Sequence, residues 1–243
     1  MAWALETHRA QMVVAPALTD VASQRIQVRP VAGISLVMVE PPTTQSGRWV
    51  KRLFDIIFAS LILIAVSPIM VATAIGIWLN DHGPVLFKQV RVGKGGEHFE
   101  CLKFRSMVTN ADEILTGLQN RSVDAVMFKM ENDPRITKIG HFIRRYSIDE
   151  LPQLWNVIRG DMSLIGPRPA LPKEVELYAP GVSRRLEVRP GLTGLWQVSG
   201  RSNLSWDDTI RLDLYYVDNW SMAQDLSILW GTIATVFSSE GAY

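Results

Sequence analysis

The sequence predicts an α+β, helix-rich fold with a small β-hairpin region, one re-entrant membrane helix and interfacial amphipathic helices. Three observations predict this fold. Residues 53–79 form an apolar run that is long enough to cross a bilayer. Residues 85–90 and 98–102 alternate as strands around a glycine-rich turn. Much of the remaining chain has apolar residues at helical spacing.

Composition limits the classes of protein to which the chain can belong. Its 243 residues are enough for one core-bearing domain with extensions. The formal net charge of +1 provides no global basic field, so we expect no nucleic-acid partner. The single cysteine, Cys101, excludes an internal disulfide and is typical of a cytosolic location.

We expect three regions along the chain. Residues 1–47 contain short β stretches at 11–17, 26–31 and 34–39, followed by a linker. They resemble the remnant of a preceding α/β domain, so we expect the chain to be a truncated form of a longer protein. Residues 48–82 hold the membrane helix, and residues 83–243 form a domain on the cytoplasmic face.

The membrane helix is predicted from residues 53–79, where Asp55 is the only charge. Ser67 and Pro68 lie near its middle, where proline breaks a backbone hydrogen bond and bends the helix, and the Ser67 hydroxyl can satisfy a freed group. Basic residues flank both ends, as expected if both ends stay cytoplasmic. We therefore favour a re-entrant helix over a spanning one. A buried core helix is the third alternative.

The predicted hairpin is followed by a pair of cations. Residues 93–96 are glycine-rich, but no Lys-Ser/Thr pair follows in the register of a nucleotide-binding loop. We therefore interpret them as the turn of the hairpin. Lys103 and Arg105 then bracket Phe104. Taken alone, such a run is typical of a solvated face.

Adjacent carboxylates, Asp149 and Glu150, precede a predicted helix over residues 151–158. With Asp149 as the N-cap, Pro152 falls in the first turn, where its missing N–H costs little. The helix dipole then keeps both acids ionised and favours an anion or metal–phosphate site. The alternative is a purely structural capping box, in which Ser147 caps the helix and Glu150 reaches back.

Two arginines lie near this acidic pair in the sequence. Arg144 precedes Asp149 by five residues, where it either clamps a phosphate or forms an ordinary surface ion pair. Arg168 stands between Pro167 and Pro169, which restrict the backbone on both sides.

Two C-terminal segments have helical patterns. Residues 204–220 are amphipathic, and residues 226–237 are apolar. Trp220 suits the headgroup level of a membrane, so both segments are candidates for interfacial helices. Packing in the core is an equally weighted alternative.

Four sequence words together resemble the bacterial sugar transferase family, the monotopic polyprenol-phosphate phosphoglycosyl transferases. The words are residues 103–107 (KFRSM), 147–154 (SIDELPQL), 160–169 (GDMSLIGPRP) and 189–194 (RPGLTG). The resemblance covers residues 51–243. The first 47 residues resemble the end of the nucleotide-binding-like domain of larger members, such as undecaprenyl-phosphate glucose or galactose phosphotransferases.

This resemblance implies an enzyme of the bacterial inner membrane, acting on its cytoplasmic face. Such enzymes transfer a sugar 1-phosphate from a UDP-sugar to undecaprenyl phosphate and release UMP, which starts exopolysaccharide, capsule or O-antigen assembly. The resemblance makes Asp149 the nucleophile of a covalent phosphosugar intermediate and Glu150 a ligand of Mg²⁺. Ser67 and Pro68 match the kink of the family's re-entrant helix.

The resemblance also assigns residues around the substrate. Arg168, with Pro167 and Pro169, matches the nucleotide-side motif, and Asp213 matches an acidic position in the C-terminal part. Charge on the diphosphate has to be neutralised, and we expect Arg144, Lys103 and Arg105 to contribute to this.

Two alternatives to this mechanism are carried forward. The chain could be a catalytically silent, membrane-anchored scaffold for polysaccharide assembly, or a phosphotransferase in which Asp149 is a general base without a covalent step. A homodimer is left open as a partner. No residue identifies the sugar, for which glucose or galactose is our expectation.

Overall fold

The computed structural model gives two compact units, Met1–Pro41 and Pro42–Tyr243. The described residues are 26–31, 34–39, 45–111, 113–114, 133–179, 181–200 and 204–238. In the first unit, strands β1 (Ile26–Val31) and β2 (Ile34–Val39) pair antiparallel. They correspond to two of the three β stretches predicted there, and the stretch at 11–17 lies outside the described residues.

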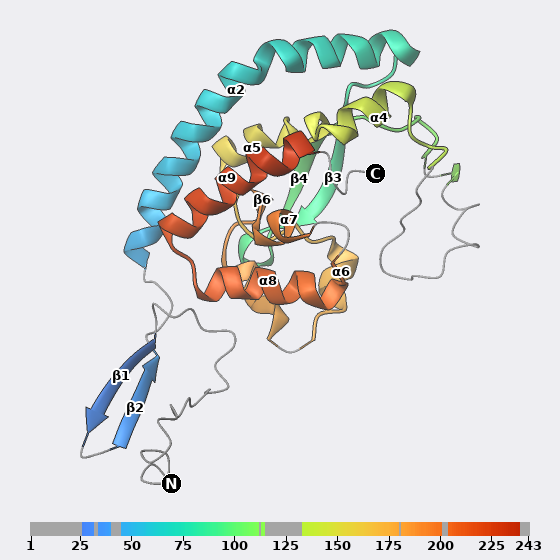
Figure 1. The fold of residues 1–243 in the computed structure, drawn as a ribbon. Helices are drawn as coiled ribbons and strands as arrows, with labels where there is room; N and C mark the ends of the chain where they lie inside the picture. The colour runs from blue at the N-terminus through green and yellow to red at the C-terminus, as the bar shows by residue number, and fades with distance from the viewer. Residues whose placement is uncertain are drawn as a thin grey trace, which may run out of the picture. The chain divides into compact units, whose positions relative to one another are not determined.

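Helix α2 (Gln45–Asp81) opens the second unit and runs through Pro68. Proline has no N–H, so the carbonyl of Ile64, four residues earlier, loses its helical donor. The Ser67 hydroxyl donates to that carbonyl at 2.8 Å and satisfies it. Figure 1 shows α2 changing direction along its length, as a proline inside a helix predicts.

One face of α2 is apolar and exposed. Residues Trp49–Asp81 are long and apolar enough to cross a membrane, and few side chains in their most apolar part are buried. Ala59 and Ile77 pack into the unit, whereas Leu61 and Ile64 are 58% and 71% exposed. A core helix of a soluble domain would be mostly buried, so that alternative does not describe α2.

The predicted hairpin is present. Strands β3 (Leu86–Val92) and β4 (His98–Phe104) pair antiparallel and are joined by a tight turn over Lys94–Gly96. Gly95 has a φ of 71°, a left-handed backbone conformation that glycine adopts without steric cost. The glycine run therefore serves as a turn.

The later elements of the second unit are mostly short helices. In chain order they are α4 (Lys138–Arg145), α5 (Gln153–Arg159), β5 (Ser163–Ile165), α6 (Pro172–Glu176), β6 (Gly191–Thr193), α7 (Leu195–Ser199), α8 (Trp206–Asp218) and α9 (Met222–Ser238). Strands β5 and β6 pair in parallel. A Cβ on Gly191 would lie 2.1 Å from the Gly166 nitrogen, so only glycine permits this approach.

The core joins α2, the hairpin, α5, β5, α8 and α9. Its buried members include Ala59, Phe99, Leu154, Val157, Met162, Leu164, Ile165, Tyr216 and Ile228. A buried asparagine ties α5 to the hairpin. The Asn156 side chain accepts from the Leu102 nitrogen at 3.0 Å and donates to the Glu100 carbonyl at 2.8 Å. It thereby pairs backbone groups on the inner edge of β4 that burial would otherwise leave unsatisfied.

The two C-terminal helices differ in how they pack. Residues 204–220 were predicted to be amphipathic, and the buried side chains of α8 are Thr209, Asp213 and Tyr216, each of which carries a polar group. This face turns inward because its polar groups find buried partners. The Trp230 side chain of α9 is 77% exposed. The position of α9 at a membrane interface stays a prediction.

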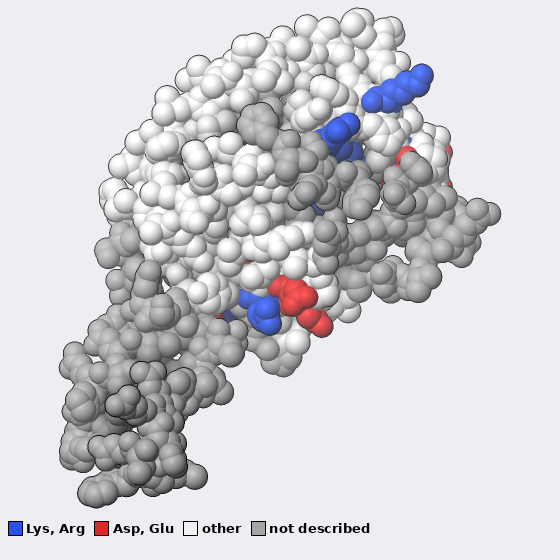
Figure 2. Space-filling model, viewed as in Figure 1, with Lys and Arg blue, Asp and Glu red and all other residues white. Residues whose placement is uncertain are grey.

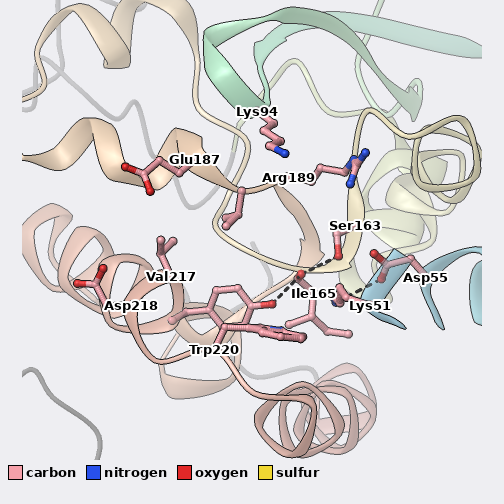
Figure 3. Close-up of a pocket in the computed structure, with 12 residues that line it drawn as sticks. Lys51, Asp55, Lys94, Ser163, Ile165, Glu187, Arg189, Val217, Asp218 and Trp220 are labelled. Atoms are coloured by element: carbon pink, nitrogen blue, oxygen red, sulfur yellow. Dashed lines mark hydrogen bonds and ion pairs between the residues drawn. The ribbon is translucent and has the colours of Figure 1, made fainter. Parts of the chain in front are cut away.

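A buried charge network holds the start of α2 against the unit (Figure 3). The Lys51 ammonium lies 3.2 Å from Asp55 Oδ1 and 2.9 Å from Asp225 Oδ2, and both acids are buried. Asp225 also accepts from the Tyr216 hydroxyl at 2.8 Å and the Trp220 indole at 3.0 Å. A cavity of about 140 Å³ lies beside this network. The network joins α2 to α8 and α9.

This network predicts a large stability effect from one substitution. Lys51→Met removes the cation and leaves two buried carboxylates facing each other, so we expect a loss of about 3–5 kcal/mol of unfolding free energy. Lys88→Met is the matched control, because the pair between Lys88 and Glu100 is exposed and contributes at most about 1 kcal/mol. Thermal unfolding in detergent, followed by tryptophan fluorescence, measures both. Equal melting temperatures for the two variants would contradict this account.

Candidate active site

The acidic pair lies in a single turn of 3₁₀ helix, Ile148–Glu150, between α4 and α5. Ser147 precedes it with a φ of 55° and makes no capping hydrogen bond, so the chain turns sharply there. Pro152 is the N-cap of α5, and Asp149 does not cap that helix. Both predicted helix starts are therefore wrong. The left-handed turn at Ser147 separates the acids from α4, and Leu151 and Pro152 separate them from α5.

Lys103 approaches the pair from the hairpin. Side chains alternate along a strand, and odd-numbered residues of β3 and β4 share one face because Arg91 lies opposite Phe99. Phe99 and Cys101 are buried, so this face points into the unit. The Lys103 ammonium therefore reaches inward and lies 2.6 Å from Glu150 Oε1.

The two neighbouring carboxyls have opposite pKa shifts. Burial and the charge of Glu150 raise the pKa of Asp149 to about 6, against the opposing effects of Lys103 and Arg144. Burial also disfavours ionisation of Glu150, but the bonded Lys103 and the nearby Arg168 outweigh it and lower the pKa of Glu150. No α-helix begins at Asp149, so a helix dipole does not lower its pKa as expected, although a pKa of about 6 still leaves Asp149 mostly ionised at neutral pH.

The Pro167-Arg168-Pro169 loop carries a further cation that acts on the pair. The Arg168 guanidinium donates to both oxygens of buried Glu174, at 3.0 and 3.3 Å, and its charge reaches Glu150. The Pro167 carbonyl accepts from the Gly191 nitrogen at 2.8 Å. These contacts fix the loop that carries Arg168.

Asp213 holds this loop in place through hydrogen bonds. Its Oδ2 accepts from the Arg168 backbone nitrogen at 3.3 Å and from Arg185 Nη2 at 2.5 Å. Burial raises the pKa of Asp213 to about 6, although Arg185 opposes the shift. Because Asp213 is fully buried, it holds the loop and does not line the space around the acidic pair.

The structure brings most of the predicted residues together. Lys103, Arg144 and Arg168 all influence the ionisation of the pair electrostatically. Arg105 is placed elsewhere: it forms an ion pair with Asp81 at the end of α2. Arg105 lies one residue beyond β4 and is buried where its guanidinium reaches Asp81 instead of the acidic pair. The expectation that Arg105 neutralises substrate charge therefore has no support in the geometry.

Three residues of the site were not predicted. Arg91 contacts the loop at the Pro169 carbonyl, Glu174 binds Arg168, and Arg185 binds Asp213. Strand alternation could have revealed Arg91, since it shares a face with Lys103. No local pattern identifies Glu174 or Arg185, whose partners are set by the tertiary fold.

The donors around the pair fit Mg²⁺ bound together with a phosphate ligand. Among the described residues, no three His, Cys, Asp or Glu side chains gather as a metal cage. Mg²⁺ does not need one, because it is typically held by one or two carboxylates, waters and substrate phosphates. Burial and the charge of Glu150 raise the pKa of Asp149, so a divalent cation beside the pair would favour its carboxylate form.

Comparisons with known proteins identify similar chains. The family model described as "Bacterial sugar transferase" matches residues 46–239. The UDP-galactose-lipid carrier transferase of Erwinia amylovora is 46% identical over 203 residues, which cover 82% of this chain and 42% of that protein. The undecaprenyl-phosphate galactose phosphotransferase of Salmonella typhimurium is 45% identical over 207 residues, covering 82% and 43%.

A shorter relative matches along most of its length. The exopolysaccharide production protein ExoY of Rhizobium meliloti is 43% identical over 202 residues, which cover 81% of this chain and 89% of that protein. By contrast, the chain matches less than half the length of the Erwinia and Salmonella proteins.

The charge asymmetry of the pair predicts its titration. We expect Asp149 to lose its proton near pH 6, so its carboxylate fraction falls as pH drops through that value. Glu150→Gln removes the like charge and should move the midpoint of Asp149 downward. Carbon-13 NMR of aspartate-labelled protein in detergent, with Asp149→Asn to assign the signal, measures both midpoints. A midpoint at or below 4, or an upward shift in Glu150→Gln, would refute this electrostatic account.

Proposed function

Because the chain belongs to the bacterial sugar transferase family, we propose that it transfers a hexose 1-phosphate from a UDP-sugar to undecaprenyl phosphate. The transfer proceeds through a covalent aspartyl-phosphosugar intermediate with release of UMP. It forms the first membrane step of exopolysaccharide, capsule or O-antigen assembly. The observation that carries this proposal is the pair of carboxyls with opposite pKa shifts, set among cations from three separate segments.

The proposed reaction has two displacements at one phosphorus atom. A carboxylate oxygen of Asp149 attacks the phosphorus that bears the sugar, and the bond from that phosphorus to UMP breaks. A phosphate oxygen of undecaprenyl phosphate then attacks the same phosphorus and expels the Asp149 carboxylate. Asp149 is regenerated, and the product is undecaprenyl diphosphate carrying the sugar. With a pKa near 6, Asp149 is mostly ionised at neutral pH and able to attack.

Cations held by the fold stabilise the charge that passes through these steps. Lys103, Arg144 and Arg168 come from the hairpin, from α4 and from the loop after β5, so they do not depend on one another for position. One preorganised donor of this kind is typically worth about 3 kcal/mol of barrier. Bound Mg²⁺, held by Glu150 beside the diphosphate, would add electrostatic stabilisation of the phosphoryl oxygens.

The structure also supports a re-entrant α2. Near its start, Arg52 donates to the carbonyls of Val157 and Ile158 at 2.7 and 2.8 Å. Near its end, Asp81 pairs with Arg105, and Ile77 packs in a core cluster. Both ends thus contact one compact unit. A crossing helix would instead place its ends on opposite sides of the bilayer.

We therefore place the outer face of α2 in the cytoplasmic leaflet of the inner membrane. Figure 2 shows most of the length of α2 as a surface without charged side chains. On α9, Leu226, Trp230 and Ile233 are at least half exposed and form a second apolar face. With this seating, the acidic pair works at the bilayer surface, where the phosphate of the lipid emerges.

A transfer assay tests the proposed reaction. Purified protein, Mg²⁺, undecaprenyl phosphate and a panel of radiolabelled UDP-sugars should yield labelled lipid and UMP. Asp149→Asn removes the nucleophile with little change of shape, so we expect activity to fall by at least about 1,000-fold. Asp207→Asn, at an exposed acid on α8, is the matched control and should keep full activity.

Each alternative gives a different outcome in this assay. A silent scaffold yields no labelled lipid from any donor. A general-base enzyme turns over but forms no phosphosugar adduct on Asp149, which mass spectrometry of protein incubated with donor alone would detect. Turnover by Asp149→Asn itself would overturn the assigned role.

Accessibility labelling tests the topology. We expect Trp49→Cys and Asn80→Cys, at exposed positions near the two ends of α2, to react with a membrane-impermeant maleimide from the same side. That side is the cytoplasmic one, exposed in inverted membrane vesicles and protected in intact cells. The parent chain is the control, because its only cysteine, Cys101, is buried. Labelling of the two positions from opposite sides would show a spanning helix.

A further inference from the structure

Arg91 lies on the inward face of the hairpin, beside the proposed site. Its register position opposite Phe99 puts it on the same face as Cys101 and Lys103. Lys103 uses this face to reach Glu150. Arg91 therefore points toward the same interior region from the neighbouring strand.

The Arg91 guanidinium is held in place by neutral acceptors. Nη1 donates to the Pro169 carbonyl at 2.8 Å, and Nε and Nη2 donate to Gln89 Oε1 at 3.1 and 2.6 Å. These contacts use three of the five N–H groups of an arginine and leave two for a ligand. Within the part of the chain that the structure describes, no carboxylate forms an ion pair with Arg91.

A second guanidinium lies close by. Burial is the main reason that the pKa of Arg91 is lowered, and the charge of Arg168 lowers it further. Glu174 neutralises Arg168 through its own ion pair, whereas Arg91 has no such partner among the described residues. The charges of Glu174 and Glu150 oppose this pKa shift, but neither carboxylate forms an ion pair with Arg91. An anion that contacts both guanidiniums would therefore stabilise two neighbouring cations, one of them partly buried.

We propose that Arg91 is a substrate-binding residue that clamps a phosphoryl group together with Arg168. Guanidinium groups suit this role because their planar fork binds phosphate oxygens in a bidentate manner. The Pro169 carbonyl fixes the position of Arg91 relative to the loop, so the two guanidiniums approach the phosphate in a preset geometry. This inference rests on the proposed function, since it takes its phosphate from the donor or from the lipid acceptor.

Kinetics of Arg91 variants test the clamp. Loss of a charge-assisted contact to phosphate should raise one KM by about 10-fold or more in Arg91→Met, with kcat changed less than KM. Arg91→Lys keeps the charge but loses the fork and should recover part of the loss. Lys94→Met is the matched control, because it removes a cation from the turn of the same hairpin and should leave both KM values unchanged.

The two substrates are varied separately to identify the phosphate. A raised KM for the UDP-sugar assigns the clamp to the donor diphosphate, and a raised KM for undecaprenyl phosphate assigns it to the acceptor. Gln89→Ala is a milder second variant, since it frees the guanidinium without removing it, and should raise the same KM by a smaller factor. Circular dichroism and thermal unfolding confirm that each variant is folded.

The outcomes separate this inference from the function on which it rests. A wild-type protein that transfers no sugar phosphate from any donor overturns the proposed function. An active wild type, with Arg91→Met indistinguishable from Lys94→Met in both KM values, overturns the clamp and leaves the function intact. A loss in Arg91→Met confined to kcat would likewise overturn a binding role.

Discussion

The requirement that buried charge be neutralised organises the catalytic unit. Taking an ion out of water costs several kcal/mol unless a partner and hydrogen bonds compensate. Lys51 therefore joins α2 to Asp225 of α9, and Arg185 joins the segment before β6 to Asp213 of α8. These pairs connect segments that are far apart in the sequence. Where the charges are placed thus determines how the helices are arranged around β5 and the hairpin.

Departures from neutralisation coincide with the proposed site. Glu150, Asp213 and Asp225 each have a cation within ion-pair distance. Asp149 forms no ion pair within the described part of the chain, and burial together with the charge of Glu150 raises its pKa. Among the described residues, Arg91 donates hydrogen bonds only to neutral acceptors. An acid and a cation that lack ion-pair partners thus lie at one place. A site for a metal and a phosphorylated substrate requires such groups.

The local parts of this fold could be predicted from the sequence. Strand alternation around a glycine turn sets the hairpin, and a long apolar run with a central Ser-Pro sets α2, because both depend on neighbouring residues. The start of α5 could not be predicted, since the acids lie in a separate 3₁₀ turn that follows a left-handed Ser147, and no local pattern indicates this conformation for a serine. The hydrogen bond between the Arg168 backbone and Asp213 could not be predicted either, because the two residues lie 45 positions apart in the sequence. Arg91 was within reach of the sequence, because strand alternation places it on the same face as Lys103, and burial then shows that this face points inward.

The neighbouring acids illustrate how one short turn can supply two chemical roles. Two adjacent carboxyls would otherwise have similar pKa values and compete for the same cation. Here the Lys103 ammonium bonds to Glu150 alone, so Glu150 is kept ionised while its charge works against ionisation of Asp149. Glu150 is then suited to hold a metal permanently. In the proposed mechanism, Asp149 keeps a more basic oxygen, which forms a stronger bond to phosphorus, yet remains mostly ionised at neutral pH. A single lysine from the hairpin would thereby separate the proposed metal ligand from the proposed nucleophile in consecutive residues.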